Sequence, residues 1–403
     1  MTSTRGDGVE FGCLQRYKIP SCAISLARAA TPPLLAKQAI MRLLRLPTLL
    51  SALSFASALP ALTSPQQEAL APASDEKPLP LLIWHGLGDT YDADGLREIG
   101  KLVQQLHPGT YIYYVRVDDD STKDRTGTFF GNITSQIAQV CDDIHQVPEL
   151  RRTDGQDGLR VDALGFSQGG QFLRGLLERC DGLSIRSLVT FGSQHNGIAQ
   201  FPACSAYDFL CKAATGLIKG NAWTEYIQNR VVPAQYYRSV NETTGLPTQD
   251  YLDHSNFLAD VNNERAAKNE TYRARMAGLE RFVMYVFAND TTVIPKESGW
   301  FAEVNATDGV VTPLKDRPIY QEDWLGLKQL DERGGLILKE HPNGHMQLED
   351  KVLVEAFNDF FGPERKTKGL VSEVEEEVEE QLRLLQDELA SHEEWMEDAK
   401  EFL

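Results

Sequence analysis

One serine stands in a sequence pattern that hydrolytic enzymes use to expose a nucleophile. Residues 165–169 read Gly-Phe-Ser-Gln-Gly, which matches Gly-x-Ser-x-Gly around Ser167. The pattern follows a predicted strand, 159–166, and precedes a predicted helix, 171–177. Small residues beside the serine permit the strained turn that lifts its Oγ out of a sheet. An isolated match is weak, because a turn serine produces it by chance, but this strand-turn-helix setting predicts a catalytic serine.

The acid and the base of such a site follow the serine in chain order, each on a loop after a later strand. Asp290 comes directly after the predicted strand 282–287 and is the predicted acid. Beyond the predicted strand 336–338, His345 lies on a turn and is preferred as general base to His341, which is still close to the strand. The competing carboxylates have no strand before them: Asp308, Asp316 and Asp323. Three histidines precede the acid and are interpreted as structural or pocket-lining: His85, His195 and His254.

Acyl transfer also needs two hydrogen-bond donors directed at the oxygen on which charge develops. The backbone N–H of Gln168, one residue after the nucleophile, is the first predicted donor. The backbone N–H of Leu87, in the glycine-rich turn after the predicted strand 79–84, is the second. Because this chemistry needs neither a metal nor an organic cofactor, the sequence predicts none.

Alternating strand and helix patterns place these residues on a mostly parallel sheet. The predicted strands are 79–84, 111–117, 159–166, 185–191, 282–287 and 336–338, and the predicted helices are 96–106, 133–144, 171–177 and 348–361. Between 196 and 279 the alternation fails, and the segment has only scattered short helical patches. We therefore expect an α/β-hydrolase fold over 79–362 with a small cap domain inserted at about 196–279.

The first 58 residues are interpreted as a leader. Residues 41–58 combine Arg42 and Arg45 with an apolar stretch and a small-x-small pattern, which is typical of a secretory signal peptide. The apolar stretch is too short for a transmembrane span, which needs roughly 20 residues. Met41 is then the working start, and residues 1–40 are an extension of the gene model or follow a poorly used upstream start. A genuine leader of 58 residues is the alternative.

The polar ends of the mature chain carry no catalytic pattern. Residues 59–78, rich in Pro, Ala, Ser and Gln, predict a flexible linker. The formal net charge is −18, and glutamate runs concentrate it in the tail, 363–403. This tail is interpreted as disordered, with a solvated amphipathic helix as the alternative. Nucleic acid is excluded as a partner, because binding phosphates needs clustered Lys and Arg.

Cysteine and asparagine patterns agree with entry into the secretory pathway. Outside the leader, an even number of cysteines without metal-binding spacing predicts disulfides rather than a zinc site. They are Cys141, Cys180, Cys204 and Cys211. Five Asn-x-Ser/Thr sequons predict N-glycosylation. They begin at Asn132, Asn241, Asn269, Asn289 and Asn305.

Longer stretches resemble the palmitoyl-protein thioesterase family, lysosomal enzymes that remove fatty acyl groups from cysteine. The similar motifs are 84–89 (Trp-His-Gly-Leu-Gly-Asp), 132–141, 165–174, 192–197, 254–265, 289–291, 320–330 and 344–348. The resemblance covers about 79–362. One departure is local: animal members have an adjacent cysteine pair after the first turn, where this chain has Tyr91 and Asp92.

The resemblance implies hydrolysis of long-chain acyl thioesters on the cysteines of proteins or peptides, through an acyl-serine. It places the triad on Ser167, Asp290 and His345, and it implies an acyl groove lined by a domain inserted after the sixth strand. It also implies a lysosomal or vacuolar location, with secretion as an alternative. The implied disulfides are Cys141–Cys180 and Cys204–Cys211; the short loop of the second pair favours it from sequence too.

Two other functions compete with this reading. A secreted lipase or carboxylesterase acting on oxygen esters has an identical triad, so only substrate competition separates it from a thioesterase. A non-catalytic binding glycoprotein predicts a broken triad, whereas all three residues are present here. The sequence leaves the oligomeric state open.

Overall fold

The computed structural model describes residues 77–201, 203–204, 208–241 and 244–364. The predicted signal peptide 41–58, the segment before it, most of the predicted linker and the acidic tail from residue 365 lie outside these described residues.

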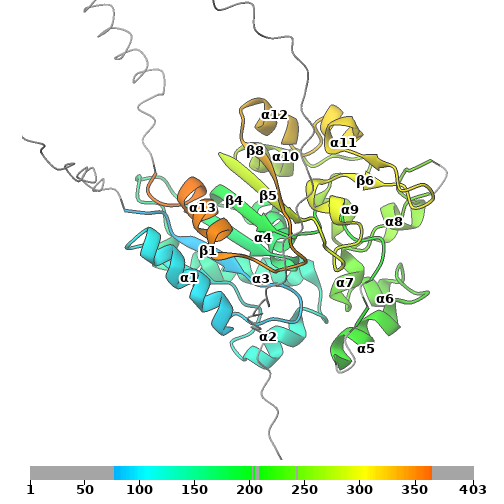
Figure 1. Ribbon diagram of the computed structural model, residues 1–403, viewed down its shortest axis with the longest axis horizontal. Coiled ribbons are helices and arrows are strands. Elements are labelled where there is room, and N and C mark those ends of the chain that lie inside the picture. Colours follow the sequence, from blue (N-terminus) through cyan, green and yellow to red (C-terminus); the bar gives the residue numbers. More distant parts are fainter. Residues whose placement is uncertain (1–76, 202, 205–207, 242–243, 365–403) are drawn as a thin grey trace, which may run out of the picture. The chain divides into compact units, whose positions relative to one another are not determined.

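A parallel sheet of six strands forms the centre of the described chain (Figure 1). The strand order is β2-β1-β3-β4-β5-β8. The strands are β1 (Leu81–Trp84), β2 (Ile112–Tyr114), β3 (Leu159–Phe166), β4 (Leu183–Phe191), β5 (Arg281–Phe287) and β8 (Leu336–His341). The predicted α/β class is confirmed, although β2 is shorter than the predicted 111–117. Because β1 has β2 on one side and β3 on the other, the order reverses there, and the crevice at such a point is where α/β sheets bind ligands.

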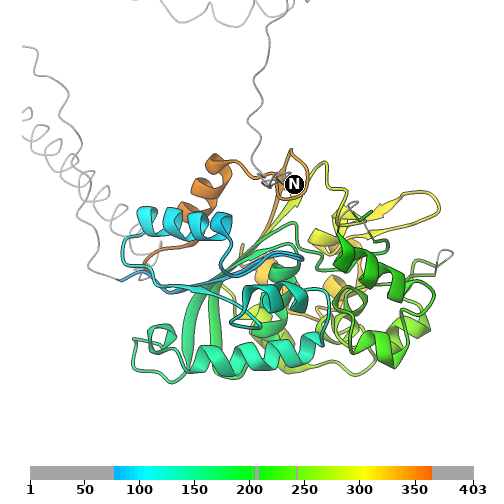
Figure 2. The same ribbon diagram turned by 90° about the horizontal axis from the view of Figure 1, so that it is seen from below.

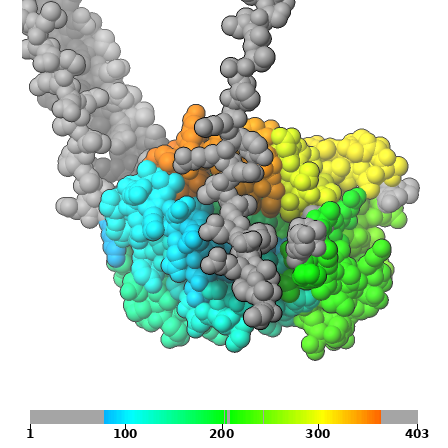
Figure 3. Space-filling model, turned by 60° about the horizontal axis from the view of Figure 1, so that its bottom comes forward, coloured from blue at the N-terminus to red at the C-terminus, as the bar shows by residue number. Residues whose placement is uncertain are grey.

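Helices cover both faces of this sheet (Figures 1 and 2). On one face, α1 (Asp94–Leu106) and α13 (Asp350–Phe360) lie side by side, and His107 Nε2 is 2.9 Å from the Phe357 carbonyl oxygen. On the other face lie α3 (Ile133–His145) and α4 (Gln168–Arg179). The blue-to-cyan surface near α1 and the orange surface near α13 adjoin in Figure 3, although they come from opposite ends of the described chain.

Coverage on both faces explains why β1 is apolar throughout. Side chains alternate along β1, so Leu81 and Ile83 pack toward α1 and α13, while Leu82 and Trp84 pack toward α3 and α4. All four are at most 3% exposed. A strand buried on both faces is expected to be a continuous apolar run, which is the signal that predicted it.

Between β4 and β5 the chain forms short helices and isolated bridges. The helices are α5 (Phe209–Ile218), α6 (Glu225–Gln228), α7 (Val232–Gln235), α8 (Gln249–His254), α9 (Leu258–Val261) and α10 (Glu270–Ala277). This stretch coincides with the predicted cap, 196–279. Four strands of the described sheet precede it, so the expectation of an insertion after a sixth strand does not match the strand count here.

Several short elements were not predicted. They are α2 (Ser121–Gly127), the 3-10 helices η1 (Pro148–Leu150), η2 (Lys296–Trp300) and η3 (Leu314–Asp316), β6 (Glu303–Val304), β7 (Val311–Thr312), α11 (Pro318–Gln321) and α12 (Leu327–Glu332). α2 reads Ser-Thr-Lys-Asp-Arg-Thr-Gly, which has no apolar periodicity.

Two disulfides are present, as the resemblance implied. Cys141 on α3 joins Cys180 after α4 with a Cα–Cα distance of 5.5 Å, and Cys204 joins Cys211 on α5 at 5.7 Å. Disulfides persist in oxidising compartments, which agrees with a secretory-pathway protein. His145 lies near the first pair, but sulfurs bonded to each other are not free to hold a metal ion. None of the helices in the described ranges is long and apolar enough to cross a membrane.

The five predicted glycosylation sites all lie within the described residues. Asn241 and Asn289 are exposed. The partly buried ones are Asn132, Asn269 and Asn305. Asn132 and Asn269 also cap α3 and α10, where their Oδ1 atoms accept backbone N–H groups. Glycosylation at each position stays a prediction.

Candidate active site

Ser167 occupies a strained turn between β3 and α4. Its φ is +50°, in the left-handed region that non-glycine residues rarely adopt, and its backbone N–H donates to the Phe191 carbonyl at 2.8 Å. The surrounding glycines are required by close packing, because a Cβ on Gly165 would collide with the backbone of Gly170. This is the strained strand-to-helix turn that the motif predicted, and it leaves the serine side chain accessible.

The structure brings together the three residues that chain order selected. His345 Nε2 is 3.0 Å from Ser167 Oγ, and His345 Nδ1 is 2.7 Å from Asp290 Oδ2. The carboxylate therefore orients the ring so that Nε2 faces the hydroxyl, which is the arrangement a serine nucleophile needs. The Asp290 side chain is 1% exposed, and its Oδ1 accepts the backbone N–H groups of Thr292 at 2.7 Å and Val293 at 3.0 Å.

The loops that carry the acid and the base are tied to each other. Asn289 Nδ2 donates to the Pro342 carbonyl at 2.6 Å, and its backbone N–H donates to the Asn343 carbonyl at 3.2 Å. These bonds join the end of β5 to the turn after β8. Since β5 and β8 are neighbours in the sheet, both loops leave from the same edge as the Ser167 turn.

The structure separates the competing residues from this group. His341 is the last residue of β8, and its Nε2 lies 3.0 Å from the Gln347 carbonyl oxygen rather than near Ser167. Asp323 pairs with Arg273 at 3.1 Å. The other two rejected carboxylates lie in the β6–β7 turn and in η3: Asp308 and Asp316.

Comparison with known proteins identifies the family. The sequence profile of the family described as palmitoyl protein thioesterase matches residues 80–345. The chain is 33% identical over 280 residues to palmitoyl-protein thioesterase 1 of Caenorhabditis elegans, which covers 69% of this chain and 90% of the relative. The chain belongs to the palmitoyl protein thioesterase family.

Two further relatives agree. A palmitoyl-protein thioesterase-dolichyl pyrophosphate phosphatase fusion of Schizosaccharomyces pombe is 37% identical over 287 residues, covering 70% of this chain and 44% of the fusion. Palmitoyl-protein thioesterase 3 of Dictyostelium discoideum is 28% identical over 282 residues, covering 68% of this chain and 90% of that protein. The protein is thus a hydrolase with the α/β-hydrolase fold.

In this family member, the two predicted oxyanion donors lie at neighbouring strand ends. Gln168 is the first residue of α4, so its N–H is among the four at a helix N-terminus without an intrahelical acceptor. Within the described ranges, no residue accepts the N–H of Leu87, in the turn after β1. Trp84 on β1 pairs with Gly165 on β3, so this turn runs beside Ser167.

A cavity of about 750 Å³ opens at the serine. Ser167 and His345 form part of its wall, and most of the remaining lining is apolar. The apolar lining comes from the Leu87 turn, α1, the cap, the loop after β5, the segment before α13 and α13 itself, and includes Leu87, Leu96, Ile99, Leu102, Ile198, Val293, Met346, Leu348 and Leu353. The size lies within the range of small-molecule sites, and the apolar walls suit a hydrocarbon chain.

The remaining histidines have different environments. His195 is fully buried, lies 3.0 Å from Thr190 Oγ1 through Nε2, and stacks on Phe301 at 5.4 Å between ring centroids. Burial, and then the charge of Arg174, holds its pKa well below 6.5, so it is a neutral core residue as predicted. His254 is exposed. His85 lines the cavity and makes contacts that its interpretation as structural did not anticipate.

Sequence reasoning missed the carboxylate that contacts His85. Asp124 on α2 is 0% exposed, and its Oδ2 lies 2.9 Å from His85 Nε2. A charged residue in a short polar helix carries no periodic signal, so only the fold reveals this pair.

Proposed function

We propose that this protein hydrolyses long-chain fatty acyl thioesters on the cysteines of proteins or peptides through an acyl-enzyme on Ser167. One observation carries the proposal: the Ser167–His345–Asp290 chain of hydrogen bonds opens onto a large, mostly apolar cavity. Membership in a family whose relatives are named palmitoyl-protein thioesterases supports the thioester as substrate.

Acylation begins when Ser167 Oγ attacks the thioester carbonyl carbon and its proton passes to His345 Nε2. The carbonyl oxygen becomes an oxyanion, which accepts the N–H groups of Leu87 and Gln168. The C–S bond then breaks, and the imidazolium returns the proton to the leaving cysteine sulfur. Asp290 keeps the imidazole in the required tautomer and stabilises its positive form.

Deacylation repeats the same steps with water. His345 removes a proton from a water molecule, the resulting oxygen attacks the acyl carbon, and Ser167 leaves with the proton returned by His345. The products are a free fatty acid and the regenerated serine. Long chains are preferred, because each buried methylene contributes about 0.8 kcal/mol of binding.

The substrates and the compartment follow from the same argument. The substrates are S-acylated proteins or their proteolytic fragments, whose acyl chain enters the cavity while the peptide stays outside. The compartment is a lysosome or vacuole reached through the secretory pathway; the two disulfides and relatives named lysosomal thioesterases support it.

Single-turnover hydrolysis of a palmitoyl-cysteine peptide beside the matched palmitoyl-serine peptide tests the proposal. We expect the thioester to react faster, and Ser167→Ala to lower the rate by roughly 10⁶-fold. Ser184→Ala is the matched control, because its hydroxyl accepts a hydrogen bond from Arg160 at 2.9 Å and does not line the cavity. Equal or faster cleavage of the oxygen ester would instead identify a lipase or carboxylesterase, and activity surviving in Ser167→Ala would exclude that nucleophile.

A further inference from the structure

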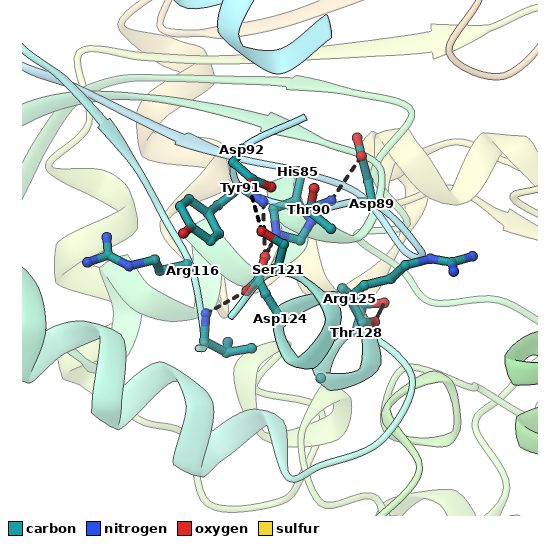
Figure 4. A network of polar contacts seen from close by, with 12 residues as sticks. His85, Asp89, Thr90, Tyr91, Asp92, Arg116, Ser121, Asp124, Arg125 and Thr128 are labelled. Carbon is teal, nitrogen blue, oxygen red and sulfur yellow. Dashed lines mark hydrogen bonds and ion pairs between the residues drawn. The ribbon is translucent and has the colours of Figure 1, made fainter. Parts of the chain in front are cut away.

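His85 faces Asp124 at the base of the turn after β1 (Figure 4). It directly follows β1 and is 2% exposed. Its Nδ1 lies 3.0 Å from the Gly86 carbonyl oxygen, and its Nε2 lies 2.9 Å from Asp124 Oδ2. The ring is therefore held at both nitrogens, one by the turn itself and the other by α2.

These partners require a proton on each nitrogen. A carbonyl oxygen and a carboxylate only accept, so a neutral imidazole would turn a lone pair toward one of them. Burial by itself lowers the pKa of His85. The hydrogen bond and charge of Asp124, the Gly86 carbonyl and the charge of Asp89 outweigh burial, so the pKa is raised above 6.5. Asp124 also accepts two backbone N–H groups, from Tyr91 at 3.0 Å and Val117 at 2.8 Å, which fix the carboxylate in place.

The Gly86 carbonyl belongs to the same peptide unit as the Leu87 N–H. A trans peptide is planar, and its C=O and N–H point in opposite directions. A donor that holds the carbonyl therefore also sets the direction of the N–H. This peptide lies close to the nucleophile, because a Cβ placed on Gly86 would be 3.2 Å from Ser167 Cβ and 3.9 Å from Ser167 Oγ. Among the described residues, one other group donates to this carbonyl: the N–H of Asp89, at the longer distance of 3.3 Å.

Helix α2 holds the rest of the turn as well. Thr128, directly after α2, accepts the Gly88 N–H through Oγ1 at 2.9 Å, and Arg125 Nε donates to the Gly88 carbonyl at 2.8 Å. Ser121 donates to Asp92 at 2.5 Å. These contacts secure the turn where the sequence lacks the cysteine pair of animal members.

We propose that His85 is a positioning residue of the oxyanion hole: anchored by Asp124, its Nδ1–H holds the Gly86 carbonyl and thereby directs the Leu87 N–H toward the reacting oxygen. The proposal rests on acyl transfer at Ser167. His85 itself does not touch the substrate carbonyl in this scheme. Its contribution is to fix a peptide plane before the reaction, when reorganisation would otherwise slow the formation of the oxyanion.

Two amide substitutions separate the two contacts of the ring. The amide nitrogen of asparagine stands near the position of Nδ1, and that of glutamine near the position of Nε2. His85→Asn therefore keeps a donor for Gly86, whereas His85→Gln keeps a donor for Asp124. We expect His85→Gln to lower the acylation rate constant by about 10²-fold and His85→Asn by less than about 10-fold, with KM within about 3-fold in both.

The comparison between the two variants decides the proposal. A purely structural histidine predicts the reverse order or equal losses, because the buried carboxylate of Asp124 is the costlier group to leave unpaired; either result would overturn the positioning role. The ratio of the acylation rate constants of His85→Gln and His85→Asn is measured on whichever ester or thioester the wild type cleaves faster. A wrong substrate assignment therefore alters the wild-type preference without altering the ratio.

A control and a measurement on the wild type complete the test. Asp124→Asn should lower both the stability of the fold and the acylation rate constant. Asp162→Asn is its control, because Asp162 is another buried aspartate, pairs with Arg186 at 2.5 Å and lies away from the cavity. This control should destabilise the fold without lowering the acylation rate constant. If the His85 variants fail to fold, nitrogen NMR of the wild-type imidazole at pH 7 decides: a proton on Nδ1 supports the proposal, and an unprotonated Nδ1 overturns it.

Discussion

The sheet that carries Ser167 and the segment between β4 and β5 bury different kinds of side chain. Most interior side chains of β3 and β4 are aliphatic or aromatic, as at Val161, Leu164 and Val189, all 0% exposed, and the charged groups buried there form one pair, Asp162 with Arg186. In the cap, the buried groups include a charged cluster around Glu264, whose side chain is 1% exposed. The difference indicates that the sheet positions the chemistry by backbone geometry, whereas the cap depends on matched charges for its shape.

The charged cluster joins the cap to the segment before β8. Arg238 Nη2 lies 2.8 Å from Glu264 Oε1, and Arg317 Nη2 lies 3.8 Å from the same oxygen. Tyr251 donates to the other oxygen of Glu264, and Glu303 contacts both arginines. Buried ion pairs gain little over apolar packing, but removing one partner leaves an uncompensated charge. We therefore expect removal of a charge in the cap to lower the stability of the fold, and removal of the Asp290 charge at the sheet edge to lower the activity instead.

Asp290→Asn removes a charge at the sheet edge and should lower kcat by about 10⁴-fold, because the wrong imidazole tautomer then faces Ser167. The melting temperature should change little. Steady-state kinetics and thermal unfolding measure both effects. Asp308→Asn, the same substitution at a competing carboxylate in the exposed β6–β7 turn, should change neither. A kcat within 10-fold of wild type in Asp290→Asn would reject this acid.

Glu264→Gln removes a charge in the cap and should lower the free energy of unfolding by about 3–5 kcal/mol, because Arg238 and Arg317 then lose their shared carboxylate. The folded fraction should keep its kcat. Chemical denaturation at a temperature where the variant is folded measures the loss.

The matched control is Glu270→Gln, which breaks an exposed pair with Arg273 at 3.5 Å. We expect a change below about 1 kcal/mol there. If both glutamate substitutions had equally small effects, charge pairing would not be what stabilises the cap.

The contrast between the mostly apolar sheet and the cap also explains which secondary-structure elements could be predicted from the sequence. β3 was predicted at its observed bounds, 159–166, because a strand covered on both faces is mostly apolar; Arg160 and Asp162 are its charged residues. The cap helices were expected only as scattered patches. Helices such as α6 and α9 have four residues each, too few to show a period, and tertiary contacts stabilise them.

The residues of the site also divide into those that the sequence predicted and those that it did not. Chain order in this fold restricted the acid and the base to loops after later strands, which selected Asp290 and His345 directly. The same rule set His85 aside, because it precedes the acid. Its pairing with Asp124 crosses 39 positions to a helix without apolar periodicity, so no local pattern indicates it.

Glu178 lies at the boundary of the two regions and gives the smallest expected effect. It is fully buried on α4 and pairs with Arg174 at 2.9 Å, while Arg174 also donates to Asn262 of the cap at 2.7 Å. Among the described residues, Glu178 Oε2 has no hydrogen-bond partner. Burial raises the pKa of Glu178 to about 7, although Arg174 and Arg179 oppose the shift. In the folded protein it therefore binds a proton more tightly than in the unfolded chain.

A raised pKa predicts a loss of stability as pH rises. The contribution is fully present below the unfolded pKa of about 4.5 and is lost as pH passes through about 7. Between pH 5 and 8, wild type should lose about 1–3 kcal/mol relative to Glu178→Gln, measured by denaturation at each pH.

Glu264 supplies the contrast with Glu178 over the same pH range. Burial alone would raise its pKa, but Arg238 and Arg317 outweigh burial and lower it below 4.5, so Glu264 stays charged throughout. The offset between wild type and Glu264→Gln should therefore not change between pH 5 and 8. If the stability difference between wild type and Glu178→Gln also did not change between pH 5 and 8, Glu178 would stay charged in the folded protein. Arg174 would then stabilise the Glu178 carboxylate as completely as Arg238 and Arg317 stabilise that of Glu264.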